Sequence, residues 1–95
     1  MARKTVPFNQ SGIVKLPNDK PATYRIQTPG GKTNYVGTAK RGRVQDRVSE
    51  HLPGGKDYVP GAKVVVEQQP SIAAARDKET RVIRRSQPKY NKQGK

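Results

Sequence analysis

The fold is decided by an alternating stretch around a glycine-rich turn, ATYRIQTPGGKTNYVGTA at residues 22–39. Residues 22–27 alternate apolar and polar side chains, which is the period of a β-strand with one buried face. The Pro-Gly-Gly at 29–31 is a turn signal, and a second β-prone segment follows around Tyr35 and Val36. The stretch therefore predicts a β-hairpin.

Two helices and a third strand are predicted after the hairpin. Every fourth residue from Val44 to Leu52 is apolar, which predicts a helix of two to three turns that ends at the following Pro-Gly-Gly. Residues 63–69 contain three consecutive valines and predict a strand that is covered on both faces. Apolar residues at helical spacing then predict a helix from its N-cap Ser71 to about Arg85.

The order strand, strand, helix, strand, helix predicts an α+β domain with a three-stranded, largely antiparallel β-sheet flanked by helices. The pattern leaves open whether the third strand pairs with the first or with the second. Residues 1–15 are expected to form an N-terminal arm, residues 16–92 the domain, and residues 93–95 a basic tail.

The composition points to one small domain with a polyanionic partner. The chain has 95 residues, with 20 Lys and Arg against 7 Asp and Glu, and a net charge of +13. So few large apolar residues beside so much charge is also typical of disorder, but here the apolar residues are clustered in periodic segments. Nucleic acid is the commonest polyanion for a basic domain, so we expect it as the partner.

Several classes of protein are excluded by what the sequence lacks. Without cysteine there is neither a disulfide framework nor a thiolate zinc site, and the single His51 cannot build a multi-histidine metal centre. No apolar run reaches the ~20 residues of a membrane span, and the start MARKTVPF lacks the apolar stretch of a signal peptide. We expect a cytoplasmic, nucleoid-associated protein with no membrane partner and no required protein partner.

One acidic residue conflicts with the apolar face of the last predicted helix. Glu79 lies seven residues after Ile72 and three before Val82, so it falls on that face. A carboxylate there must pair with a cation, become protonated or bind a metal, because an isolated buried charge is too costly. Both a rim ion pair with an arginine and a metal site fit this position.

The first predicted helix and the hairpin carry further candidate residues. Arg43, Arg47 and His51 recur every four residues, which is typical of a solvated helix face and also suits an edge that binds phosphate. Tyr24 and Tyr35 lie on the two arms of the hairpin, as ordinary strand aromatics or as part of a site. With one buried acid, these residues suit phosphodiester hydrolysis, which needs a cation on the phosphate, a metal and a base.

The same residues resemble the GIY-YIG nuclease family. Ala-Thr-Tyr at 22–24 and Tyr-Val-Gly at 35–37 are similar to the two halves of its signature, although the first half usually reads Gly-Ile-Tyr. Arg-Val-Ser-Glu-His-Leu at 47–52 resembles the family's helix. The segment from Glu79 to the Pro-Lys-Tyr-Asn ending at Asn91 is similar to the N-terminal nuclease domain of the bacterial nucleotide-excision-repair incision subunit, here as a small stand-alone domain.

The resemblance implies a metal-dependent DNA endonuclease. By the family pattern Glu79 holds one divalent cation, Mg²⁺ or else Mn²⁺, and Arg47 binds the scissile phosphate. Tyr35 takes the proton of the attacking water, directly or through its hydrogen-bond partners, and Tyr24 orients phosphate or water. His51 is the alternative proton relay, because its ordinary pKa near 6.5 suits a base.

The resemblance and the charge together predict a DNA-binding surface. Gly37 is expected to let the substrate backbone approach closely, and Asn91 to hold the terminal segment against the site. The segment after Lys40 is about two residues longer than usual, so Arg43 is a second candidate for binding the scissile phosphate. The expected backbone contacts come from Lys40, Arg41, Arg43, Lys89 and Lys92.

Two other functions compete with this one. A catalytically inactive nucleic-acid-binding module of the same fold would bind without cleaving, but it has little reason to retain both tyrosines, the arginine and the acid. A small basic ribosome-associated protein would explain the charge and leave the position of Glu79 unexplained. RNA is kept as an alternative substrate to DNA.

Overall fold

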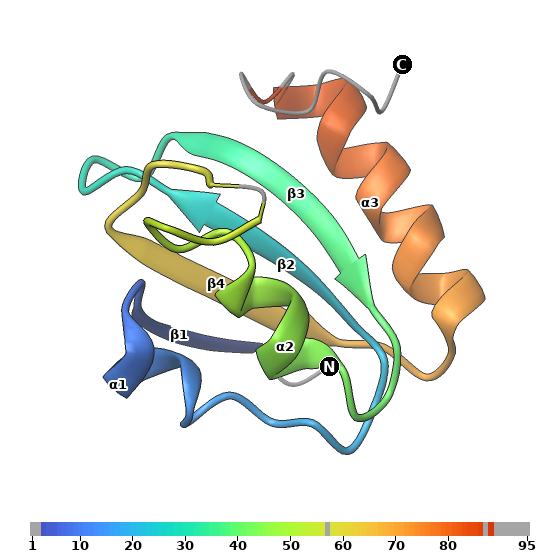
Figure 1. Cartoon of the computed structure of the whole chain (residues 1–95). Helices are drawn as coiled ribbons and strands as arrows, with labels where there is room; N and C mark the ends of the chain where they lie inside the picture. The colour runs from blue at the N-terminus through green and yellow to red at the C-terminus, as the bar shows by residue number, and fades with distance from the viewer. Residues whose placement is uncertain (1–2, 57, 87, 89–95) are drawn as a thin grey trace.

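The strands form one antiparallel sheet with helices packed against it. The computed structural model describes residues 3–56, 58–86 and 88. The sheet order is β1-β4-β2-β3 (Figure 1), and all three pairings are antiparallel. The predicted α+β class is confirmed. In chain order the elements are β1 (Arg3–Pro7), α1 (Gln10–Ile13), β2 (Ala22–Gln27), β3 (Thr33–Ala39), α2 (Val44–Ser49), β4 (Lys63–Gln68) and α3 (Ile72–Ser86).

The sheet has four strands, so the prediction of three is wrong. The additional strand is β1, which pairs with β4 at one edge of the sheet. Val6 is its only buried residue, and Arg3 and Lys4 are exposed, as charged residues often are on edge strands. A strand with one apolar residue has no alternating pattern to reveal it.

The segment after β1 also belongs to the domain. Phe8 and Ile13 are buried in the same apolar cluster as the inner face of the sheet. The expected separation of an N-terminal arm at residues 1–15 is therefore wrong for residues 3–15, which supply a strand, the helix α1 and part of the core.

The central strand β2 presents alternate residues to two sides of the sheet. Tyr24 lies in the apolar cluster that contains Val44 and Val48 of α2. On the other side Thr23 donates a buried hydrogen bond of 2.9 Å from its Oγ1 to the backbone oxygen of Ala75 in α3. In Figure 1, α2 lies in front of the sheet and α3 lies along the β3 edge.

The pairing that the pattern left open is resolved by β4, which lies between β1 and β2. Its three valines, Val64, Val65 and Val66, are all buried, so the predicted strand covered on both faces is confirmed. The β4 segment therefore connects the N-terminal strand to the hairpin.

The helix predicted from Val44 to Leu52 is shorter than expected. α2 ends at Ser49, and His51 and Leu52 follow in a tighter turn, in which the Leu52 N–H donates to the oxygen of Ser49 at 3.1 Å. Such three-residue hydrogen bonds are common at helix ends. The turn keeps Leu52 in the core while it directs the buried side chain of His51 toward the sheet.

The last helix follows its prediction closely. The Ser71 side chain accepts a hydrogen bond of 3.1 Å from the Ala74 N–H, so its predicted N-cap role is confirmed. Ala75 and Val82 are buried on the face toward the sheet. None of the helices in the described part of the chain is long and apolar enough to cross a membrane.

Gly12→Ala tests whether the N-terminal segment is part of the cooperative fold. A Cβ on Gly12 would overlap the backbone carbonyl of Pro7, so the substitution should lower the free energy of unfolding by about 1–3 kcal/mol in urea titrations. Gly30→Ala is the control, because a Cβ there would meet only Thr28 Oγ1 at 3.9 Å. Equal stability of the two variants would contradict the assignment of this segment to the core.

Candidate functional site

Three of the predicted site residues form a buried cluster of rings. The ring of His51 lies 4.5 Å from that of Tyr35 and 5.7 Å from that of Tyr24, measured between ring centres. Tyr24 Oη and His51 Nε2 are 2.9 Å apart and share a hydrogen bond, whose donor depends on the histidine tautomer. The structure thus brings together residues from β2, β3 and the turn after α2.

Gly37 makes the ring cluster possible. It pairs with Tyr24 across the two strands of the hairpin, and a Cβ there would lie 2.5 Å from Tyr24 Oη and 3.0 Å from Tyr35 Cε2. Gly37 is itself buried. The expected close approach of the DNA backbone to Gly37 stays a prediction, whereas the structure shows that the two tyrosine rings need the space that a side chain at Gly37 would fill.

Tyr24 is a neutral, completely buried phenol. Burial is the main cause that raises its pKa far above the ordinary value of 10, and the neighbouring Tyr35 adds to this, while the charge of Arg47 opposes it. With no exposed surface, Tyr24 touches neither solvent nor an outside phosphate. Its expected direct role on phosphate or water is thus replaced by a structural one, the hydrogen bond to His51.

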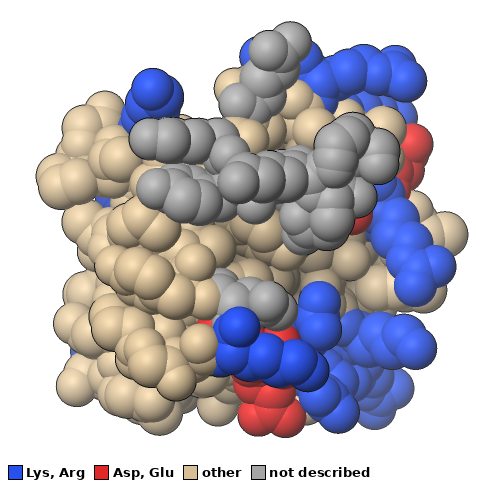
Figure 2. All heavy atoms as spheres, turned by 45° about the horizontal axis from the view of Figure 1, so that its top comes forward, with Lys and Arg blue, Asp and Glu red and all other residues tan. Residues whose placement is uncertain are grey.

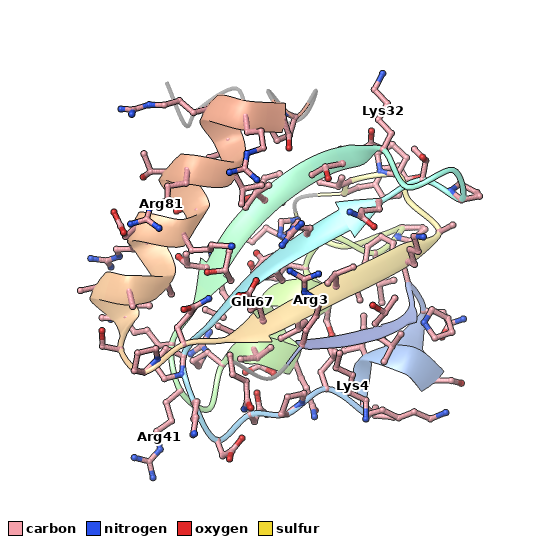
Figure 3. The ribbon with its side chains drawn as sticks, turned by 180° about the vertical axis from the view of Figure 1, so that it is seen from behind. Arg3, Lys4, Lys32, Arg41, Glu67 and Arg81 are labelled. Carbon is pink, nitrogen blue, oxygen red and sulfur yellow. The ribbon has the colours of Figure 1, made fainter. Side chains whose placement is uncertain are left out.

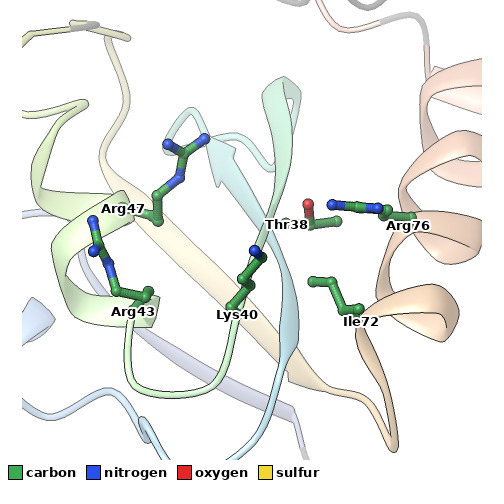
Figure 4. A pocket seen from close by; sticks show the side chains of 6 residues that line it. All are labelled: Thr38, Lys40, Arg43, Arg47, Ile72 and Arg76. Atoms are coloured by element: carbon green, nitrogen blue, oxygen red, sulfur yellow. The ribbon is translucent and has the colours of Figure 1, made fainter.

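A cationic pocket of about 310 Å³ opens between α2 and α3 at the β3 edge. Arg43 and Arg47 approach from α2, and Arg76 approaches from α3 (Figure 4). Four of the six lining side chains carry positive charge, so the pocket suits an anion. Its lining is formed by Thr38, Lys40, Arg43, Arg47, Ile72 and Arg76.

Positive charge extends from the pocket over this part of the surface. Figure 2 shows Lys and Arg gathered on the side of the molecule that carries α3, whereas the opposite side is mostly uncharged. Two of the pocket arginines have partial counter-charges: Arg43 Nε lies 3.6 Å from Asp46 Oδ2, and Arg47 Nη1 lies 3.6 Å from Glu50 Oε1. Both pairs are partly exposed and are therefore weak.

Glu79 lies next to the pocket, one helical turn beyond Arg76. Burial is the main cause that raises its pKa above the usual value, and the charges of Arg76 and then Arg47 oppose that effect. No cation of the described residues lies within ion-pair distance of its carboxylate. The rim ion pair that the sequence allowed is therefore not formed with any of them.

The residues around Glu79 fit Mg²⁺ only in a binding mode that needs very few protein ligands. Within residues 3–56, 58–86 and 88, no three His, Cys, Asp or Glu side chains lie together in a metal-binding group. Mg²⁺ often binds to one or two carboxylates and takes its other ligands from water and substrate phosphates. A half-buried carboxylate beside an anion pocket is compatible with that mode, in which Glu79 would be the protein ligand and a bound phosphate would supply further oxygens.

The structure separates the two candidate arginines. Both line the pocket, but only Arg47 acts electrostatically on Tyr24 and on Glu79. Arg43 stands at the N-cap of α2, outside the helix proper, and the side chains of Arg43 and Arg47 are exposed to a similar extent, 58% and 45%. Arg47 is therefore better placed to act beside the ring cluster.

The structure describes only two of the other residues predicted to bind DNA, Lys40 and Arg41. Lys40 lines the pocket, whereas Arg41 is exposed and does not line it. The remaining three, Lys89, Asn91 and Lys92, lie outside the described residues, as does the tail at 93–95.

Arg76 is the charged residue of the pocket lining that the sequence analysis did not include among its candidates. Its signal in the sequence is its place in the helix, three residues before Glu79 and four after Ile72, which puts all three on neighbouring positions of one face. That face lines the pocket only because α3 packs beside β3, and no local sequence pattern predicts this packing.

A second charged cluster lies away from the pocket and is internally paired. Glu67 Oε1 lies 3.5 Å from Arg25, 3.6 Å from Arg3 and 3.8 Å from Lys78. Figure 3 shows Arg3 beside Glu67 on the face of the sheet seen from behind. With three cations around one carboxylate, this cluster joins β1, β2, β4 and α3 and has a structural role.

Comparison with protein-family models finds no match for this chain, and comparison with curated proteins finds none either.

Tyr24→Phe should change how stability depends on pH. Because the pKa of Tyr24 is raised in the folded state, the unfolded chain loses this proton first above about pH 10, and stability falls as pH rises. The variant should be less stable near neutral pH by about 1 kcal/mol, the value of a lost hydrogen bond, and its stability should approach that of the wild type at alkaline pH. Urea unfolding across pH 7–11 measures this, and parallel profiles would contradict it.

Proposed function

We propose that the protein is a metal-dependent DNA endonuclease that hydrolyses phosphodiester bonds with chemistry of the GIY-YIG type. The observation that carries the proposal is the convergence of the Tyr24, Tyr35 and His51 ring cluster with Arg47 and Glu79 at one edge of the sheet. These residues come from distant parts of the chain. A purely structural polar cluster has no need for a cationic pocket beside it.

The pocket cations supply the binding of the phosphate. In hydrolysis the oxygen of water forms a new P–O bond while the bond to the leaving sugar oxygen breaks, and negative charge grows on the phosphate oxygens. Preorganised donors stabilise this charge most strongly when they are fixed before the reaction. Arg47 lies within α2, whereas Arg43 stands at its N-cap, so we assign the scissile phosphate to Arg47.

The ring cluster supplies an acceptor for the proton of the attacking water. Tyr35 is the most exposed member of the cluster, at 9%, compared with 2% for His51 and 0% for Tyr24. Tyr35 Oη accepts the proton of the attacking water as its own hydroxyl proton passes to His51, whose ring centre lies 4.5 Å from that of Tyr35. This step requires the tautomer in which His51 Nε2–H donates to Tyr24 Oη and Nδ1 is unprotonated. Tyr24 holds the histidine ring through the hydrogen bond at Nε2.

Glu79 is assigned to the divalent cation, Mg²⁺ or Mn²⁺. A cation bound there would stabilise the charge on the leaving oxygen. The carboxylate must be ionised for this, and the charges of Arg76 and Arg47 favour that form against the effect of burial. A DNA substrate would place the protein at the nucleoid, and RNA is the alternative substrate.

The second candidate function is a nucleic-acid-binding module without catalysis. The observation in its favour is that Tyr24 and His51, which are 0% and 2% exposed, form a buried hydrogen bond with each other. Both candidates predict binding. Incubation of the wild type with supercoiled plasmid, branched DNA and RNA, in Mg²⁺, Mn²⁺ or EDTA, separates them by whether metal-dependent cleavage occurs.

Glu79→Gln should abolish metal-dependent nicking while DNA binding survives or tightens, because the change removes a metal ligand and one negative charge. Asp77→Asn is the matched control, since it removes an exposed carboxylate from the same helix that pairs only with Arg81 in the described structure. Plasmid nicking and electrophoretic mobility shift are measured for both. Wild-type nicking by Glu79→Gln would overturn the metal assignment.

Tyr35→Phe should lower the single-turnover cleavage rate by a factor of at least ~10², the usual contribution of a general base. Only a hydroxyl is lost, so the fold should be retained. Tyr58→Phe removes a hydroxyl from a tyrosine that is 53% exposed and should cleave at the wild-type rate. If both variants cleave equally fast, the proton acceptor is not Tyr35.

A further inference from the structure

Arg76 occupies the wall of the pocket opposite the arginines of α2. It comes from α3, and Figure 4 shows its side chain directed toward Thr38 on β3, across the pocket from Arg47. The pocket therefore has guanidinium groups on two walls, and Lys40 stands between them at the end of β3. An anion in this pocket can be bound from both sides.

Arg76 differs from the arginines of α2 in its ion pairing. In the described part of the chain neither Arg76 nor Lys40 takes part in an ion pair, whereas Arg47 pairs with Glu50. Glu79 interacts with Arg76 electrostatically but lies beyond ion-pair distance. An arginine offers a rigid fork of donors that matches phosphate oxygens, so Arg76 has its donors available for an outside phosphate.

The size of the pocket limits what enters it. At about 310 Å³ it stands at the lower end of the range for ligand pockets, roughly 300–1,000 Å³. A volume of this size suits a phosphate group with its adjoining sugar. The lining comes from α2 with its N-cap, the end of β3 and α3, so the pocket faces the β3 edge.

We propose that Arg76 is a second phosphate ligand. One strand crosses the β3 edge between α2 and α3, with one phosphate on Arg47 and the neighbouring phosphate on Arg76 and Lys40. The proposal rests on the proposed function only in taking nucleic acid as the polyanion. It assigns Arg76 to positioning the strand and not to the bond that breaks.

The test compares Arg76→Leu with Arg84→Leu, which removes the same charge from an exposed position of the same helix outside the pocket. Binding of a single-stranded oligonucleotide is measured in EDTA over a range of salt. Arg76→Leu should weaken binding about tenfold, as for one charge-assisted contact, and should reduce the slope of log K against log salt by about 0.7. Arg84→Leu should change neither by that amount, and equal losses in the two variants would overturn the proposal.

A second arm uses inorganic phosphate alone, followed by amide NMR. The wild type and Arg84→Leu should show shifts at Thr38 and Lys40, and Arg76→Leu should show them only at about tenfold higher phosphate. Arg76→Lys should keep the salt slope and lose part of the affinity, because it retains charge without the fork. Shifts unaffected by Arg76→Leu would contradict the assignment, and well-dispersed spectra establish that the variant is folded.

The outcomes also separate this inference from the proposed function. If the wild type never cleaves but Arg76→Leu selectively loses phosphate and oligonucleotide binding, the nuclease proposal fails and the phosphate ligand stands. If the wild type cleaves and Arg76→Leu binds like Arg84→Leu, the nuclease proposal stands and the role of Arg76 fails.

Discussion

The hydrogen bond between Tyr24 Oη and His51 Nε2 holds the end of α2 against the centre of the sheet. It is buried, so breaking it would leave polar atoms without water, and that cost fixes the geometry. The hydroxyl end of the Tyr24 ring occupies the space of a side chain on its cross-strand neighbour, and this is possible only because that neighbour is Gly37. This hydrogen bond fixes the position of α2 on the sheet and therefore the position of Arg47.

The neighbouring residue of the same strand fixes the other wall of the pocket. Thr23 points to the opposite side of the sheet and donates a buried hydrogen bond to the backbone of Ala75 in α3. Two consecutive residues of β2 thus position two helices on opposite sides of the sheet. The pocket between α2 and α3 is a consequence of this alternation. The hydrogen bond between Tyr24 and His51 positions α2, which carries Arg47. The hydrogen bond between Thr23 and Ala75 positions the part of α3 next to Arg76.

Local patterns were enough to predict the hairpin, β4 and α3 with its Ser71 cap, because each depends on periodicity within a few residues. They were not enough for β1, whose one buried side chain, Val6, leaves no alternation to detect. The sequence singled out Tyr24, Tyr35 and His51 one by one, but no pattern predicted that their rings lie together. Arg76 was missed because its role depends on how α3 packs against β3, and that packing is a long-range property of the chain.

Glu79 is subject to two opposing effects on its protonation, burial and the neighbouring cations. Burial raises its pKa, and the charges of Arg76 and Arg47 lower it, so the carboxylate depends on these cations to stay ionised. A phosphate bound to the same cations would offset their positive charge and so reduce their repulsion of any cation at Glu79. A divalent cation at the carboxylate would in turn add positive charge beside the phosphate. Under the proposed function, phosphate and metal should therefore each increase the affinity for the other, because linkage between the two sites is reciprocal.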